Sequence, residues 1–195
     1  MSQGRKNKIA IVGHTRGIGK AIADLYNKKG FDVIGLSRSN GFDIIQDQEK
    51  IIESIEGSDL VVLNAHADRG QLNLLKRIYG LYAFDKMKVA VITSTSGLEE
   101  EPDYGQFKVW DKFKYVQYCE IKKELIEYIE ELQQELISKK LSVYDVCPDV
   151  VDTEMTKGLW ENLPKLTAQE VAEAVRYCFE STYNINKMVI QKNAK

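Results

Sequence analysis

Two pairs of residues place a phenol and an ammonium at the spacing of one helical turn: Tyr118 with Lys122, and Tyr104 with Lys108. Residues four positions apart lie one above the other on a helix, so both groups of a pair can point into the same space. A free tyrosine has a pKa of ~10. A cation ~4 Å away, at an effective dielectric of ~20, favours the phenolate by ~4 kcal/mol and lowers that pKa by ~3. Each pair therefore predicts a tyrosine able to transfer protons near neutrality. Because a chain with ten tyrosines contains such pairs by chance, the rest of the sequence must choose between them.

Composition narrows the classes of protein to consider. The 195 residues predict one domain, residues 1–195, and 44% hydrophobic with 29% charged residues is ordinary globular usage. A net charge of −2 with interspersed signs argues against a nucleic-acid or anionic-membrane partner, and no apolar run is long enough to span a membrane. Three widely spaced cysteines (Cys119, Cys147, Cys178) predict a reduced, cytoplasmic protein, and the two histidines suggest no metal site.

A glycine-rich turn joins the first predicted strand to the first predicted helix. The apolar run Lys8–Val12 predicts a buried strand, and residues 20–29 have helical periodicity. The turn between them contains Gly13, Thr15, Arg16, Gly17, Ile18 and Gly19. Glycines let a backbone approach a pyrophosphate, and a helix N-terminus offers free N–H groups. We therefore predict a phosphate site, with an ordinary glycine-rich turn as the alternative.

The end of the second predicted strand indicates which dinucleotide this site binds. Many dinucleotide folds place a carboxylate there to hold the ribose 2′-hydroxyl. This chain has Ser37 and Arg38 instead, with Arg16 in the glycine turn as a second cation. A guanidinium presents forked donors that suit a 2′-phosphate, so NADP(H) is favoured over NAD. The alternative is that both arginines are solvated surface charges.

The remaining elements alternate between strands and helices. Such alternation predicts an α/β fold of the doubly wound, Rossmann-like type, with a mostly parallel sheet of about seven strands and helices on both faces. Gly13, Ser37, Asn64 and Ser94 then fall at the carboxyl ends of strands, where ligands bind. The further strands are predicted at 31–36, 41–45, 59–63, 88–93, 141–147 and 187–191, and the further helices at 46–55, 71–84, 115–139 and 167–180, with a short amphipathic segment at 153–163.

Taken together, these motifs resemble those of the short-chain dehydrogenase/reductase family over nearly the whole chain. The glycine spacing 13, 17, 19 is similar to the family's own, and Ser94 lies three residues before Gly97 like the family's catalytic serine. One helix, one turn and one strand separate Lys122 from Pro148, as in the family, whereas Lys108 would leave a surplus of four helical turns. The resemblance therefore selects Tyr118 and Lys122. The other similar segments are Asp43-Ile44 (adenine pocket), Asn64-Ala65 (strand end) and Pro148 to Met155 (nicotinamide cap).

The resemblance implies hydride transfer between NADP(H) and a small carbonyl or alcohol substrate. Ser94 would hydrogen-bond the substrate oxygen and Tyr118 would exchange its proton. Lys122 would hold the ribose and keep the Tyr118 pKa low, with Asn73 as a candidate proton-relay residue. Val151 and Thr153 would hold the carboxamide. The family's habit of pairing through the helices at 71–84 and 115–139 would give a homodimer or homotetramer.

Two departures from the family pattern leave other functions open. Asp149 and His66 stand where the family has glycines, so they narrow the site or alter its substrate preference. They also support a catalytically idle NADP(H)-binding sensor or interaction protein as the alternative. A sugar-nucleotide epimerase or dehydratase would use the same Tyr–Lys chemistry, but such chains are longer. Substrate walls are expected at 159–163 and in the acidic, aromatic loop 99–110.

Overall fold

The computed structural model describes residues 6–99 and 112–193. Its centre is a six-stranded, wholly parallel sheet in the order β2-β1-β3-β4-β5-β8. The strand order reverses direction between β1 and β3, which is the switch point of a doubly wound sheet. The strands are β1 (Lys8–Val12), β2 (Asp32–Leu36), β3 (Leu60–Leu63), β4 (Lys88–Ile92), β5 (Ser142–Pro148) and β8 (Lys187–Ile190).

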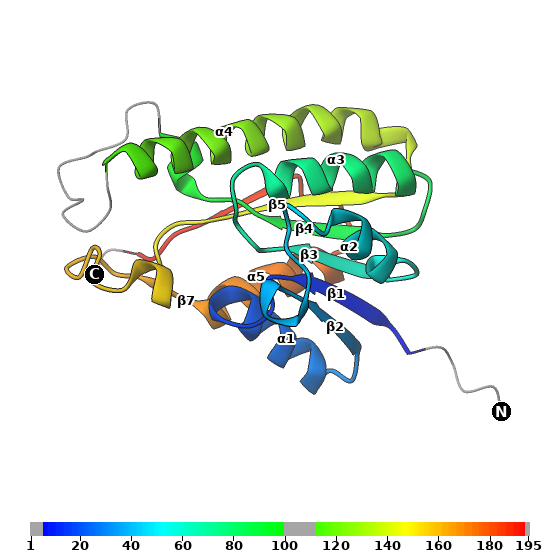
Figure 1. The fold of residues 1–195 in the computed structure, drawn as a ribbon, viewed down its shortest axis with the longest axis horizontal. Helices are drawn as coiled ribbons and strands as arrows, with labels where there is room; N and C mark the ends of the chain where they lie inside the picture. The colour runs from blue at the N-terminus through cyan, green and yellow to red at the C-terminus, as the bar shows by residue number, and fades with distance from the viewer. Residues whose placement is uncertain (1–5, 100–111, 194–195) are drawn as a thin grey trace.

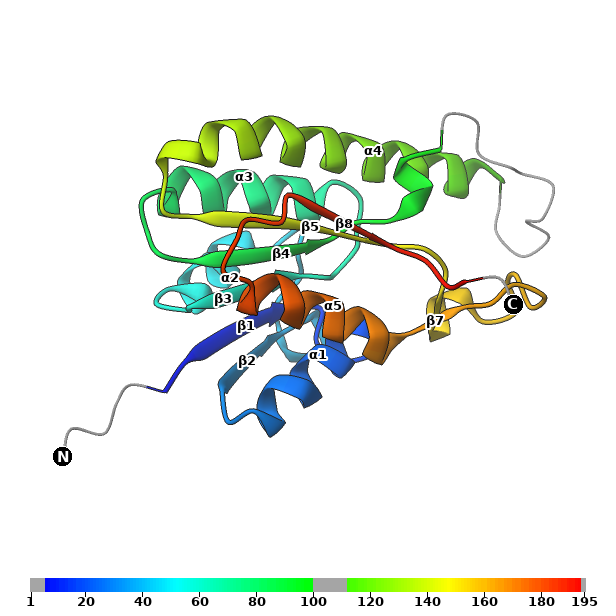
Figure 2. The ribbon, with the colours of Figure 1, turned by 180° about the vertical axis from the view of Figure 1, so that it is seen from behind.

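Helices cover both faces of this sheet (Figures 1 and 2). On one face lie α1 (Gly17–Lys28) and α5 (Ala168–Glu180), which pack against each other. The other face carries α2 (Gln48–Ile55), α3 (Gly70–Tyr82) and α4 (Lys112–Glu135). The predicted Rossmann-like, doubly wound fold is confirmed.

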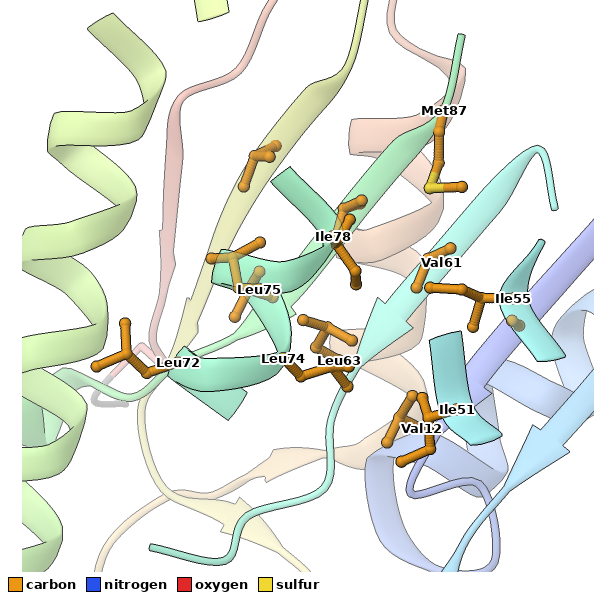
Figure 3. Close-up of a cluster of buried hydrophobic side chains, with 14 of the residues drawn as sticks. Val12, Ile51, Ile55, Val61, Leu63, Leu72, Leu74, Leu75, Ile78 and Met87 are labelled. Atoms are coloured by element: carbon orange, nitrogen blue, oxygen red, sulfur yellow. The ribbon is translucent and has the colours of Figure 1, made fainter. Parts of the chain in front are cut away.

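The alternating side chains of the strands supply both cores. On β1, Ala10 and Val12 belong to the cluster beneath α2, α3 and α4, whereas Ile9 and Ile11 belong to the cluster beneath α1 and α5. Successive side chains of a strand point to opposite faces, so a strand buried on both faces reads as a continuous apolar run. Figure 3 shows the first cluster, where Ile51 and Ile55 of α2 lie near Val12 and Val61.

One sequence prediction about secondary structure was wrong, the strand at 41–45. Residues 41–45 form turns because the Asp43 carboxylate accepts hydrogen bonds from the backbone N–H groups of Ile45 (2.8 Å) and Gln46 (3.2 Å). This side-chain-to-backbone bonding competes with strand pairing, and the main sheet therefore has six strands. The segment 153–163 is a single 3-10 turn, Glu154–Thr156, followed by turns, because the Thr156 hydroxyl bonds the backbone carbonyl of Val151.

Short elements complete the fold near the carboxyl ends of the strands. They are the paired strands β6 (Val151–Asp152) and β7 (Leu166–Thr167), and 3-10 turns at Arg38–Asn40 and Thr95–Gly97. A further 3-10 turn, Leu136–Ser138, follows α4 and precedes β5 at the amino ends of the strands. The pair Tyr104 and Lys108, and all but the first residue of the predicted loop 99–110, lie outside the described residues. Within the described part of the chain, no helix has the length and apolar character to cross a membrane.

Candidate active site

A cavity of about 920 Å³ opens at the carboxyl ends of the strands. The glycine turn forms one end, and the segment after β5 forms part of its wall, on the same side of the molecule as the start of α4 (Figure 1). Most residues predicted to bind a cofactor or substrate meet here. They are Gly13, Thr15, Arg16, Gly17, Ile18, Ser37, Arg38, Ile44, Asn64, Ala65, Ser94, Tyr118, Lys122, Pro148, Val151 and Thr153.

The glycine turn needs its glycines for close packing. Gly13 has a φ of +92°, and a Cβ there would lie 2.7 Å from the backbone nitrogen of Ala65. At Gly19, a Cβ would lie 1.9 Å from the carbonyl oxygen of Gly13. The same oxygen accepts a hydrogen bond from the Asn64 side-chain amide at 2.9 Å. Gly19 therefore shapes the turn from behind and does not line the cavity.

The turn also presents a cradle for phosphate. Helix α1 begins at Gly17, directly after Arg16, so its first N–H groups lie at the edge of the cavity. Ser37 and Arg38 line the same end from the carboxyl end of β2. A helix N-terminus with two guanidinium groups nearby fits a phosphorylated dinucleotide. Asp43 does not line the cavity, because its carboxylate is used in the turn after β2.

Ser94 and Tyr118 bring two hydroxyl groups together at the middle of the cavity. Ser94 follows β4, and its oxygen also accepts a hydrogen bond from the backbone N–H of Ser96 at 3.2 Å. Burial raises the pKa of Tyr118 to about 12, and a side-chain hydrogen bond with Ser94 opposes part of that rise. Tyr118 is therefore a protonated phenol at neutral pH, close to the serine that was predicted beside it.

Lys122 lies near the Tyr118 ring and is hydrogen-bonded to two buried polar groups. Its Nζ donates hydrogen bonds to the Gln71 side-chain oxygen (2.8 Å) and to the carbonyl oxygen of Ile92 (3.0 Å), and its residue is only 3% exposed. Burial lowers the Lys122 pKa to about 8. The Nζ atom is 5.8 Å from the centre of the Tyr118 ring.

The expectation that Lys122 would lower the Tyr118 pKa was wrong for this conformation. The ammonium is directed to a side-chain amide and a carbonyl, and not to the phenol oxygen. Burial then dominates the pKa of the phenol, because removing water disfavours the charged phenolate.

Gln71, not Asn73, is the residue of α3 that reaches Lys122. Gln71 is 2% exposed, and its amide nitrogen also donates to the carbonyls of Leu63 (2.9 Å) and Ile92 (3.1 Å). Asn73 is exposed and lies outside the cavity. The signal was present in the sequence: Gln71 shares the helical stripe of Leu74, Leu75 and Ile78, whereas Asn73 does not.

A second glycine allows α4 to approach the strand-end turn that carries Ser94. A Cβ at Gly97 would lie 2.8 Å from the backbone carbonyl carbon of Lys122 and 2.9 Å from the Ile126 Cδ1. A larger residue at this position would force the turn after β4 or α4 to shift. Gly97 therefore sets the separation between Ser94 and the helix that carries Tyr118 and Lys122.

The two residues that depart from the family pattern both line the cavity. The His66 ring meets the Tyr118 ring edge-on, with 4.9 Å between centroids, and burial lowers the His66 pKa to about 4. Asp149 follows β5, and one of its carboxylate oxygens accepts a hydrogen bond from the Thr95 hydroxyl at 3.1 Å. His66 is thus a neutral wall beside the tyrosine, and Asp149 is held next to the turn that bears Ser94.

Comparison with known proteins agrees with this architecture. No family model matches the chain. Over 204 aligned residues, it is 28% identical to the 3-oxoacyl-(acyl-carrier-protein) reductase FabG of Vibrio cholerae, covering 85% of this chain and 82% of that protein.

Solved structures share the fold at lower identity. A short-chain dehydrogenase/reductase of Vibrio parahaemolyticus has a TM-score of 0.74 at 18% identity, over 95% of this chain and all of the other. A Burkholderia cenocepacia short-chain dehydrogenase in complex with NADP has a TM-score of 0.76 at 15% identity, over 96% of this chain and 89% of the other. A 3-ketoacyl-(acyl-carrier-protein) reductase of Brucella melitensis complexed with NADH has a TM-score of 0.75 at 14% identity, over 94% of this chain and 96% of the other.

These similarities agree with the motifs in the sequence and with the cavity that those motifs line. Three features of the structure agree with this similarity: the order of the strands, the glycine turn after β1, and the Ser94 and Tyr118 hydroxyl groups that line the cavity. In sequence and in fold, the chain is similar to short-chain dehydrogenases/reductases.

Proposed function

We propose that this chain is an NADP(H)-dependent oxidoreductase that reduces a small carbonyl substrate, with Ser94, Tyr118 and Lys122 as its working residues. The observation that carries the proposal is that the Ser94 and Tyr118 side chains line one cavity, close enough for Ser94 to act on the Tyr118 pKa, and that this cavity also contains the glycine turn. Two hydroxyls beside one another can hold a single carbonyl oxygen, and the glycine turn can hold a dinucleotide within the same cavity.

In this reaction the cofactor supplies the hydride, and residues of the chain bind the substrate oxygen and supply the proton. The bound nicotinamide supplies a hydride to the carbonyl carbon. Ser94 donates a hydrogen bond to the carbonyl oxygen and stabilises the negative charge that develops there. Tyr118 transfers its hydroxyl proton to the same oxygen, so that the ketone or aldehyde becomes an alcohol and the cofactor is oxidised. Lys122, held by Gln71, binds the ribose next to the nicotinamide.

The protonation state of Tyr118 supports reduction as the physiological direction. A pKa of about 12 leaves the phenol protonated at neutral pH, as a proton donor must be. Alcohol oxidation needs the phenolate instead, which becomes abundant only in strongly alkaline solution. A phosphorylated cofactor is supported by Arg16 and Arg38 at the glycine end of the cavity.

Binding and turnover measured together test the proposal. Purified protein should bind NADPH more tightly than NADH, by about tenfold or more if Arg38 makes one charge-assisted hydrogen bond with the 2′-phosphate. The variant Arg38→Leu should lose that preference, whereas Arg77→Leu, a change far from the cavity on α3, should keep it. NADPH oxidation should be seen with at least one neutral aldehyde or ketone. Equal affinity for the two cofactors would contradict the cofactor assignment.

A catalytically idle NADP(H)-binding sensor remains the second candidate. It is favoured by His66 and Asp149, which occupy space beside Tyr118 and Ser94 where the family has glycines. The sensor predicts tight NADPH binding, no oxidation of NADPH with any carbonyl compound, and no effect of Tyr118→Phe on any measured property of the complex.

A further inference from the structure

The two ends of the cavity carry opposite charges. Arg16 and Arg38 lie at the glycine end. Near Ser94, the acidic lining residues are Asp149, which bonds Thr95, and Glu99, which lies close enough to Tyr115 to act on its charge. Glu154 also lines the cavity, but it follows Thr153 beside Gly17 and pairs with Lys157. Among the described lining residues, the remaining cation is Lys122, and its ammonium is turned inward to Gln71 and the carbonyl of Ile92. The end that would receive the substrate is therefore acidic.

Asp149 is the best placed of these carboxylates to touch a substrate. It follows Pro148 at the end of β5, and its backbone N–H donates to the carbonyl of Ile190 at 2.9 Å. Its Oδ1 accepts from the hydroxyl of Thr95, the residue directly after Ser94. The carboxylate is thus anchored from its backbone and from one oxygen, close to the serine that would hold the reacting carbonyl.

No cation of the described chain neutralises Asp149. The ion pairs within residues 6–99 and 112–193 do not include it. Its side chain is partly buried, and a partly buried carboxylate gains from a cationic partner. The Thr95 bond occupies one oxygen, and a carboxylate has lone pairs for further donors on both.

We propose, resting on the function proposed above, that the substrate is a small carbonyl compound bearing a protonated amine, which Asp149 binds while Ser94 and Tyr118 hold the carbonyl oxygen. The ammonium is unchanged in the reaction: the hydride of NADPH forms the new C–H bond, the carbon–oxygen π bond breaks, and the Tyr118 proton forms the new O–H bond. Leu159 and Tyr115 supply apolar walls for the body of such a molecule. Carboxylate substrates are disfavoured because like charges repel.

Three methyl ketones of nearly equal size test this assignment: aminoacetone (cationic), hydroxyacetone (neutral) and pyruvate (anionic). We expect kcat/KM with NADPH to be about tenfold higher for aminoacetone than for hydroxyacetone, and lower again for pyruvate. Asp149→Asn keeps an acceptor for Thr95 but removes the charge, so it should cut the preference for aminoacetone over hydroxyacetone about tenfold. Glu127→Gln, an exposed change on α4 outside the cavity, should keep it.

Hydroxyacetone separates failure of this inference from failure of the proposed function. Turnover of hydroxyacetone that equals or exceeds turnover of aminoacetone, or an unchanged preference in Asp149→Asn, would overturn the inference and leave the reductase intact. If none of the three ketones is reduced, calorimetry of the NADP-loaded protein with 1-aminopropan-2-ol decides. The inference is supported if Asp149→Asn weakens the binding of this amine about tenfold. It is refuted if the substitution leaves the affinity unchanged, or if the amine does not bind.

Discussion

Replacing Gln71 by methionine should destabilise the protein and shift the titration of Lys122. The side chain makes three hydrogen bonds in a fully buried setting: it accepts from the Lys122 ammonium and donates to the carbonyls of Leu63 and Ile92. A hydrogen bond to a charged group contributes about 1.5–3 kcal/mol, and a buried carbonyl left without a donor costs about 1–3 kcal/mol. Relaxation recovers part of this, so we expect a loss of about 2–4 kcal/mol in the free energy of unfolding.

The same substitution changes the pKa of Lys122 in a known direction. Removing an acceptor that favours the charged form lowers this pKa further below its value of about 8. In Gln71→Glu, a carboxylate replaces the amide and raises the pKa, because an opposite charge favours the ammonium. If Lys122 must be charged to hold the ribose, the alkaline limb of kcat/KM for NADPH moves to lower pH in the first variant and to higher pH in the second.

Urea unfolding and the pH dependence of kcat/KM are the two assays. Asn73→Met is the matched control, because Asn73 is on the same helix but exposed, and we expect its effect on unfolding to stay within about 0.5 kcal/mol. The reasoning is refuted if Gln71→Met and Asn73→Met unfold alike, or if Gln71→Glu and Gln71→Met move the alkaline limb in the same direction.

Two further predictions follow from burial and from close packing. The Lys122 pKa is about 8 in the folded chain and 10.5 for a lysine exposed to water, so between these pH values the unfolded state binds more protons and stability rises with pH. Urea titrations should therefore show that the free energy of unfolding rises over this pH range by up to about 3 kcal/mol more than in Lys122→Met. A difference between the two proteins that does not change with pH would contradict the burial of the charge. Gly97→Ala should cost about 1–3 kcal/mol, because its Cβ would lie 2.8 Å from the backbone of Lys122; Gly80→Ala, where a Cβ meets nothing within 4 Å, should stabilise α3 by up to about 1 kcal/mol in the same assay.

The fold was predictable because its signals are local and repeated. Apolar runs such as Lys8–Val12 alternate with amphipathic segments, and a strand buried on both faces has few other interpretations. The error at residues 41–45 arose because apolar residues around Asp43 suggested a strand. The carboxylate of Asp43 instead bonds two following backbone N–H groups and holds a turn. Such side-chain-to-backbone bonds are not visible in a hydrophobic pattern.

The candidate site was predictable in its membership but not in its electrostatics. Spacing alone brought Tyr118 and Lys122 to one helix face, and the cavity contains both. The partner that directs the lysine, Gln71, comes from another element, and only the packing of α3 against α4 reveals it. Burial then decides the Tyr118 pKa, and burial depends on residues far apart in the sequence, such as His66.

The central claim is that the Tyr118 hydroxyl gives its proton to a substrate that NADPH reduces. The most direct measurement is the single-turnover rate of NADPH oxidation by Tyr118→Phe at saturating carbonyl substrate, compared with Tyr128→Phe, a change of the same kind on the same helix but outside the cavity. We expect Tyr118→Phe to lose about 10²–10⁴-fold in rate while its affinity for NADPH is unchanged, and Tyr128→Phe to keep both. Equal rates in the two variants would contradict the account.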